Sequence, residues 1–168
     1  MSKIWVGIDL GKRGAICIMK ENGDQVDIVP MPLDKEGNVC YKQLSEMFED
    51  YEGFRGHVVY EKLAPIFGTS KTTAFVMGHQ AGAMRMLCEA RFMSYTEVPA
   101  KVWQKEMFAD VPLIKKPGSK SNDTKAMALE ACRKLYPDMK LTFGTRAKKP
   151  HDGLIDAILI ADYCKKLY

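Results

Sequence analysis

KIWVGIDLGKRGAICIMK, residues 3–20, is the stretch that decides the fold. Its first eight residues form an apolar run rich in β-branched side chains, and the sequence Gly-Lys-Arg-Gly at 11–14 separates them from a second apolar run at 15–20. Two such runs joined by a short glycine-containing turn are typical of a β-hairpin. A third run, at 25–31, follows the turn residues Asn-Gly-Asp, so the pattern predicts three antiparallel strands.

The rest of the chain alternates between helical periodicity and short apolar runs. In chain order the predicted elements are a helix over 41–51, a strand over 57–61, a helix over 72–91, a strand over 92–98, and helices over 99–108, 123–136 and 151–166. Either Ser121 or Asn122 is expected to cap the helix at 123–136. With 168 residues, of which 46% are hydrophobic, we expect one α/β domain spanning residues 1–168.

Composition excludes several classes of protein. No run of 18 apolar residues is present, and Asp9, Lys12 and Arg13 interrupt the first apolar stretch, so we expect neither a membrane span nor a signal peptide. The expected location is the cytoplasm of a bacterial or phage-infected cell. The five cysteines show no CxxC spacing, which argues against a zinc site and against disulfides, and they are predicted to be reduced core thiols.

Basic residues are concentrated in one part of the chain. The segment 115–150 holds ten Lys or Arg residues against three acids, a net charge of +7, whereas the whole chain carries only +4 and the remainder is therefore −3. Such an asymmetry favours a polyanionic partner, although a solvated loop and helix face would give the same composition.

Two acidic residues stand in apolar strands. Asp9 lies within GIDLG in the first predicted strand, and Glu61 closes the strand HVVYE. A buried carboxylate is costly unless it binds a cation or accepts hydrogen bonds, so both positions indicate a site. A capping or salt-bridge role is the alternative for Asp9 alone, and the second acid makes that alternative weaker.

The last predicted helix begins with a further acidic pair. Asp152 and Asp156 are four residues apart, which places them on one helix face, where their charges repel unless a cation lies between them. Asp152 also suits the helix dipole without any metal. Four acids without a His/Cys cluster favour Mg²⁺ or Mn²⁺, and two such ions about 4 Å apart would suit phosphodiester hydrolysis. His151 is either an additional ligand or base, or a helix cap, and Asp162 is expected to be a surface charge.

Four segments together carry a family resemblance. GIDLGKRGAI, VVYEKL, VPAKVWQKEMF and HDGLIDAILIADY occur in an order and at separations that resemble the RuvC-type Holliday junction resolvases, particularly their phage branch. The resemblance implies a ribonuclease H-like fold with a mixed five-stranded sheet, three strands antiparallel and then two parallel, flanked by helices. It also implies a homodimer that makes paired nicks in four-way DNA junctions with a divalent metal, as in DNA recombination and repair.

Position by position, the resemblance assigns metal ligands and catalytic residues. Asp9, Glu61 and Asp156 match the family's first-strand Asp, fourth-strand Glu and last Asp. The family's remaining ligand stands three residues before the last one, where this chain has Gly153. We therefore expect Asp152 to complete the site, with His151 as the alternative.

Substrate contacts are expected from basic residues and one aromatic. The resemblance makes Phe67 the candidate for probing the junction centre, although a core phenylalanine that closes its loop is equally compatible, and it makes the helix 72–91 the dimer interface. Phosphate contacts are expected from Lys62, Lys71, Lys101, Lys105, Lys115, Lys116, Lys120, Arg146, Lys148 and Lys149.

Three other functions fit parts of the pattern. Actin-like kinases and ATPases share GIDLG, but they need a second lobe for which 168 residues leave no room. A non-catalytic nucleic-acid-binding module would have no reason to keep four acids on a basic protein. A flap or branched-DNA nuclease of the same fold differs only in substrate, and the sequence leaves that choice open.

Overall fold

The fold is built on one mixed sheet of five strands. The computed structural model describes the chain except for residues 1–2, 22–25, 52–54 and 64–67. The strands are β1 (Lys3–Asp9), β2 (Ala15–Lys20), β3 (Val26–Pro30), β4 (Arg55–Glu61) and β5 (Ser94–Val98), in the spatial order β3-β2-β1-β4-β5. β1 to β3 pair antiparallel, whereas β4 pairs parallel with β1 and with β5. The predicted sheet of three antiparallel and two parallel strands is therefore confirmed.

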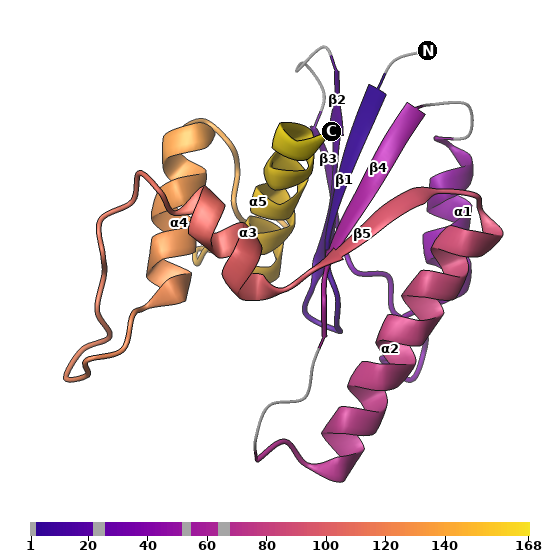
Figure 1. The fold of residues 1–168 in the computed structure, drawn as a ribbon, viewed down its shortest axis with the longest axis horizontal. Helices are drawn as coiled ribbons and strands as arrows, with labels where there is room; N and C mark the ends of the chain where they lie inside the picture. Colours follow the sequence, from indigo (N-terminus) through magenta and orange to yellow (C-terminus); the bar gives the residue numbers. More distant parts are fainter. Residues whose placement is uncertain (1–2, 22–25, 52–54, 64–67) are drawn as a thin grey trace.

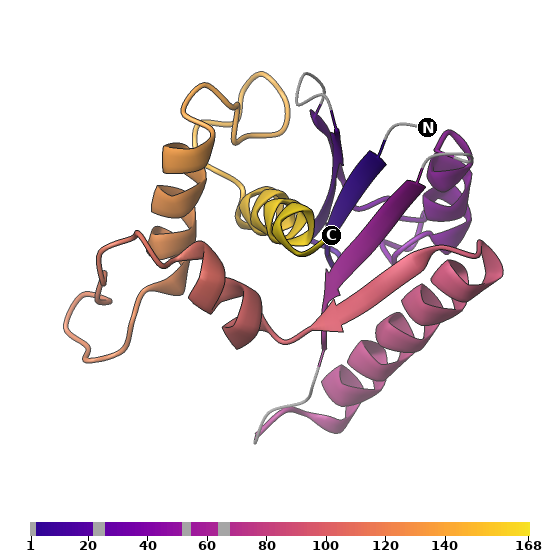
Figure 2. The ribbon, with the colours of Figure 1, turned by 45° about the horizontal axis from the view of Figure 1, so that its top comes forward.

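Helices cover both faces of this sheet, and the three layers are visible in Figure 1 and Figure 2. The helices are α1 (Tyr41–Glu49), α2 (Lys71–Ala90), α3 (Ala100–Met107), α4 (Thr124–Leu135) and α5 (Asp152–Leu167). One apolar core lies between the sheet and α1 and α2, and a second core lies between the sheet and α3, α4 and α5. The buried α5 runs along β1, and Gly7 permits this approach.

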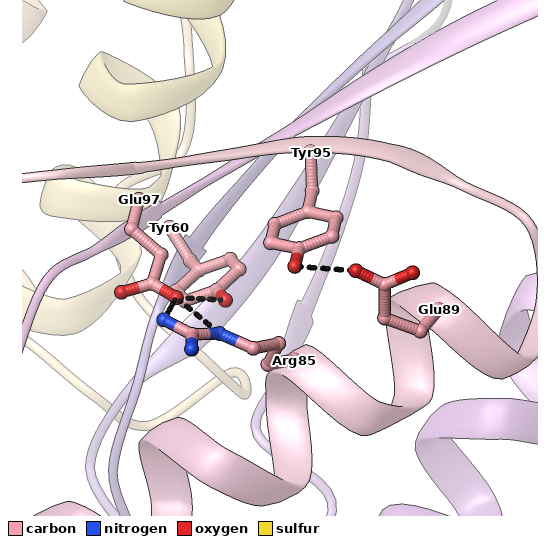
Figure 3. A network of polar contacts seen from close by, with 5 residues as sticks. All are labelled: Tyr60, Arg85, Glu89, Tyr95 and Glu97. Atoms are coloured by element: carbon pink, nitrogen blue, oxygen red, sulfur yellow. Dashed lines mark hydrogen bonds and ion pairs between the residues drawn. The ribbon is translucent and has the colours of Figure 1, made fainter.

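Polar contacts add to the apolar packing that holds α2 on the sheet (Figure 3). Arg85 of α2 donates from Nε to the carboxylate of Glu97 on β5 at 3.0 Å, and the hydroxyl of Tyr60 on β4 donates to the same carboxylate at 3.0 Å. The hydroxyl of Tyr95 donates to Glu89 near the end of α2 at 2.8 Å. These contacts fix the helix that directly follows the β4–α2 connection.

One predicted strand start and one predicted helix cap are wrong. The strand predicted over 92–98 begins at Ser94, because Phe92 has a left-handed φ of 52° and its amide donates to the carbonyl of Glu89, which closes α2. The cap of α4 is Asp123 rather than Ser121 or Asn122, since the Asp123 carboxylate accepts from the amide of Ala126 at 3.1 Å.

Buried polar and thiol groups both bear on the sequence predictions. The prediction that Asp162 is a surface charge is wrong, because the residue is only 8% exposed. Its carboxylate accepts a 2.7 Å hydrogen bond from the hydroxyl of Tyr136, and this bond joins α5 to the end of α4. The cysteines are free, and four of the five are buried, as predicted. Among the described residues, no helix combines the length and apolar character that crossing a membrane requires.

We predict that Gly7→Ala strongly destabilises the protein. A Cβ built at Gly7 would lie 2.2 Å from the amide nitrogen of Ala161 and 2.3 Å from the carbonyl oxygen of Ala157. Both are backbone atoms of α5, so the helix must move away from β1, and the free energy of unfolding should fall by about 3 kcal/mol. Chemical denaturation measures this change.

Gly82→Ala on α2 is the matched control, with both variants unfolded at a protein concentration low enough to keep the subunits apart. A Cβ there meets no atom of the subunit within 4 Å, and alanine favours helix more than glycine, so the free energy of unfolding of the subunit should rise by up to about 1 kcal/mol. Equal effects of the two substitutions would contradict the close packing of α5 on β1.

Candidate active site

Two acidic residues meet where neighbouring parallel strands end. Asp9 is the last residue of β1 and Glu61 is the last residue of β4, and the register pairs Ile8 with Tyr60 immediately before them. Side chains alternate between the two faces of a sheet, so Asp9 and Glu61 both point toward the face that α5 covers. The two predicted strand acids are therefore brought together.

The N-terminal turn of α5 adds the other two acids. Asp152 is the first residue of α5 and is exposed, whereas Asp156 lies one turn deeper and is partly buried. A cleft of about 440 Å³ is lined by Asp9, Asp152 and Asp156, together with the turn that follows β1. Glu61 lies close to the acids of this cleft, since repulsion from its charge raises the pKa of both Asp9 and Asp156.

The fold makes ionisation of Asp9, Glu61 and Asp156 less favourable than in water. Burial, and then repulsion from Asp156, Glu61 and Asp152, together raise the pKa of Asp9 to about 8. Burial, and then repulsion from Glu61 and Asp152, raises the pKa of Asp156 to about 7. A group of carboxyls that destabilise one another's charged form is typical of a functional site.

A tryptophan orients Glu61. The indole Nε1 of Trp103 on α3 donates to the Glu61 carboxylate at 3.2 Å, and the Trp103 ring is fully buried. Burial raises the pKa of Glu61, whereas the indole hydrogen bond lowers it. The sequence reasoning did not assign Trp103 a role, although it lies within the quoted segment VPAKVWQKEMF.

His151 caps α5. Its Nδ1 accepts a hydrogen bond from the amide of Leu154 at 3.2 Å, and its ring meets Phe143 edge to face. Only Nε2 therefore remains for a ligand. His151 also lines the acidic cleft, so its position is compatible with both roles that the sequence left open.

Gly153 stands where no side chain fits. A Cβ built there would lie 2.2 Å from the carbonyl oxygen of Arg13, 2.9 Å from a carboxylate oxygen of Asp9 and 2.9 Å from the Cα of Gly14. The first turn of α5 thus touches the turn after β1 backbone to backbone. This contact gives a physical reason why position 153 carries no ligand and why the neighbouring Asp152 is the available carboxylate.

Basic side chains surround the acids, and the sequence reasoning did not identify them as part of the site. Lys12 and Arg13, from the turn after β1, and Lys125, from α4, line the same cleft. The Nζ of Lys125 lies 2.5 Å from a carboxylate oxygen of Asp152, and this hydrogen bond raises the pKa of Lys125. The adjacency of GKRG to Asp9 was a usable signal for Lys12 and Arg13, but nothing local in the sequence connects Lys125 to Asp152.

The donor set fits a hard divalent cation. Carboxylate oxygens are the ligands that Mg²⁺ and Mn²⁺ prefer. Within the described part of the chain, no three His, Cys, Asp or Glu side chains form a group that could hold a metal by themselves. Mg²⁺ usually binds through one or two carboxylates, with water and substrate phosphate completing its shell, so an open arrangement suits an ion shared with a phosphate substrate.

Most of the expected substrate-binding residues lie in the described part of the chain. Phe67 lies outside the described residues. The amino group of Lys115 donates to the carbonyl of Lys120 and to the side chain of Asn122, so it is engaged within its own loop. The other expected phosphate contacts are exposed: Lys62, Lys71, Lys101, Lys105, Lys116, Lys120, Arg146, Lys148 and Lys149.

Comparison with known proteins identifies the fold. The sequence matches no protein-family model and no curated protein. A structure described as Thermus thermophilus RuvC covers 98% of this chain and 96% of its own, at 14% identity and a TM-score of 0.56. A second, described as T. thermophilus RuvC in complex with Holliday junction substrate, has the same coverage at 13% identity and a TM-score of 0.54. The RuvC-like, ribonuclease H-like fold implied by the resemblance is confirmed.

We predict that Asp9→Asn stabilises the metal-free protein at alkaline pH. The pKa of Asp9 is raised from 3.8 to about 8 on folding, so folding favours its protonated form and wild-type stability falls as the pH rises between these values. Asparagine carries no charge to bury. At pH 8 in EDTA the variant should be more stable by about 1–3 kcal/mol, and the difference should shrink at pH 5.

Thermal unfolding at both pH values measures this, with Asp138→Asn as the control at an exposed carboxylate. Addition of Mn²⁺ at pH 8 should raise the Tm of the wild type and of Asp138→Asn but not that of Asp9→Asn. A less stable Asp9→Asn protein, or a difference that does not depend on pH, would show that Asp9 is not a strained carboxylate.

Proposed function

We propose that this chain is a divalent-metal-dependent endodeoxyribonuclease that resolves four-way DNA junctions by paired nicks. The observation that carries the proposal is the convergence of Asp9, Glu61 and Asp156 from three separate elements, with Asp152 at the mouth of the same cleft. Four carboxylates on a chain of net charge +4 fit a site that binds cations and works on a polyanion.

The site residues have distinct tasks in this proposal. When bound, two Mg²⁺ or Mn²⁺ ions would activate the attacking water and stabilise the leaving 3′ oxygen. Asp9, Glu61, Asp152 and Asp156 would hold them, and cation binding would bring Asp9 and Asp156 into their charged forms despite their raised pKa values. The indole of Trp103 keeps Glu61 in place throughout.

The basic side chains around the cleft orient the DNA backbone. Lys12 and Arg13 come from the turn after β1 and Lys125 comes from α4, so a phosphate that enters the cleft meets positive charge from two parts of the fold. Phosphate contacts farther out come from the exposed lysines near Glu61, on α3 and before α5. These contacts position the backbone and carry no base information.

Branched DNA is the substrate class that the fold favours. A protein of similar fold, T. thermophilus RuvC, has been solved with a Holliday junction substrate. The likeness to that protein supports a four-way junction here, and a flap or other branched DNA is the competing substrate for the same acidic site.

The outward face of α2 supports a homodimer. Phe75 and Met86 are 76% and 66% exposed, and a Cβ at Gly78 or Gly82 would meet no atom of the subunit within 4 Å. The small residues of α2 therefore leave space on the side away from the sheet. Paired nicks need two active sites, and a twofold axis at this face would supply the second one.

Cleavage assays test the proposal. End-labelled four-way junctions, flaps, linear duplex and single strands are incubated with wild type or Asp9→Asn in Mg²⁺, Mn²⁺ or EDTA. We expect symmetric nicks in the junction that require metal, with a rate at least about 100-fold lower for Asp9→Asn. Metal-dependent cutting mainly of flaps or linear DNA would keep the site but reject the substrate, and binding without cutting in any metal would indicate a non-catalytic module.

Two further variants in the same assay separate Asp152 from His151. Asparagine is a good helix cap, so His151→Asn keeps the cap of α5 while it removes the imidazole. Asp152→Asn removes the carboxylate beside Gly153. We expect Asp152→Asn to lose most of the activity and His151→Asn to retain it, and the reverse result would assign the fourth ligand to His151.

A further inference from the structure

The connection between α3 and α4 contains a β-hairpin that projects from the body of the molecule (Figure 1, Figure 2). Lys115 and Asn122 form an antiparallel bridge. The amide of Asp123 donates to the carbonyl of Ile114 at 2.8 Å, and the amide of Lys116 donates to the carbonyl of Ser121 at 3.1 Å. We call residues 114–123 the basic hairpin.

Its tip is a tight turn with suitable residues. The amide of Ser119 donates to the carbonyl of Lys116 at 3.1 Å, which closes a four-residue turn. Pro117 occupies the second position, and Gly118 occupies the third with a φ of +68°, a left-handed conformation that favours glycine. The sequence thus specifies the conformation of the tip locally.

Internal polar contacts fix the shape of the hairpin. The Nζ of Lys115 donates to the Lys120 carbonyl at 3.0 Å and to the Asn122 side chain at 2.6 Å, across the two arms. The hydroxyls of Ser119 and Ser121 lie 2.8 Å apart, and the Ser121 amide donates to the Ser119 hydroxyl. Lys115 is therefore a structural residue of the hairpin rather than a free phosphate contact.

The remaining charge of the hairpin points to an anionic partner. No Asp or Glu occurs between Val111 and Asn122. Lys116 and Lys120 are exposed, and in the described part of the structure their amino groups make neither a hydrogen bond nor an ion pair. Two free cations held on a stiff turn, with serine hydroxyls beside them, suit the phosphate oxygens of a nucleic-acid backbone.

The base of the hairpin is connected to the acidic cleft. Asp123 ends the hairpin and caps α4 through the Ala126 amide, and Lys125, two residues later, pairs with Asp152. In Figure 1 the hairpin lies at the lower left and the N-terminal end of α2 at the bottom, and both extend beyond the lower ends of β1 and β4. A DNA strand in the cleft would therefore continue past the hairpin on one side.

We propose that the basic hairpin is a preformed arm that binds the phosphate backbone of one duplex arm of the substrate through Lys116 and Lys120. The proposal rests on the proposed nuclease function and deepens it. Because its own hydrogen bonds fix the hairpin before binding, little conformational entropy is lost when DNA binds. The contact reads no bases, so it holds DNA of any sequence in register with the acids.

Salt-dependent binding tests the arm. The double variant Lys116→Gln/Lys120→Gln is compared with the double variant Lys3→Gln/Lys166→Gln. The control removes two exposed charges, at the start of β1 and near the end of α5, which are the ends of these elements away from the acids. Binding to a four-way junction is measured over a range of salt concentrations in Ca²⁺, with single-turnover cleavage in Mg²⁺ at saturating protein. Two lost phosphate contacts should lower the slope of log K against log salt by about 1.8.

We expect that loss of slope, and about tenfold weaker binding at low salt, only for the hairpin pair. If the hairpin pair and the control pair have equal salt slopes and the wild type cleaves, the proposed role of the basic hairpin is wrong, while the proposed nuclease function stands. A wild type that binds no DNA would overturn both proposals.

Lys115→Gln keeps both tip lysines but removes the contacts across the hairpin. It should weaken binding several-fold while leaving the salt slope unchanged, because Lys115 acts through the shape of the hairpin. A slope reduced by about 0.9 would instead make Lys115 itself a phosphate contact and would overturn the structural role given to it.

Discussion

The close approach of α5 to β1 is the constraint on which the rest of the structure depends. Gly7 allows the helix backbone to touch the strand, and Gly153 allows the first turn of the helix to touch the turn after β1. These two contacts bring the carboxylates of α5 to the ends of β1 and β4. A side chain at either glycine would separate Asp156 from Asp9, so backbone packing determines the geometry of the acidic cleft.

This geometry costs stability, because the same burial that gathers the carboxyl groups opposes their ionisation. Positive charge lies beside these carboxyl groups. Lys125 pairs with Asp152, and Lys12 and Arg13 line the cleft. Lys125 forms its ion pair with the exposed Asp152 at the mouth, and although its charge also favours ionisation of Asp156, the pKa values of Asp9 and Asp156 stay raised. Buried carboxyl groups that oppose one another's ionisation are typical of functional sites, and a bound cation would relieve that opposition.

Much of the fold and part of the site could be predicted from the sequence. Alternating apolar runs and helical periodicity gave the element order, and acids inside apolar strands marked Asp9 and Glu61, because both signals are local. The remaining features depend on contacts between distant segments. Trp103 meets Glu61 and Lys125 meets Asp152 only in the folded chain, and Asp162 is buried because Tyr136 of α4 lies over it. A charge near the end of an amphipathic helix gives no local sign of such a partner.

The central claim is that the acidic cleft binds a divalent cation between elements that are far apart in the sequence. Crystals of the wild-type protein soaked in Mn²⁺, with anomalous diffraction data, test this claim most directly. The account predicts a manganese peak in the cleft, with carboxylate oxygens of Asp9 and Asp156 among its ligands at roughly 2.0–2.3 Å. Well-ordered crystals with no peak in the cleft, or with manganese bound only elsewhere on the surface, would contradict it.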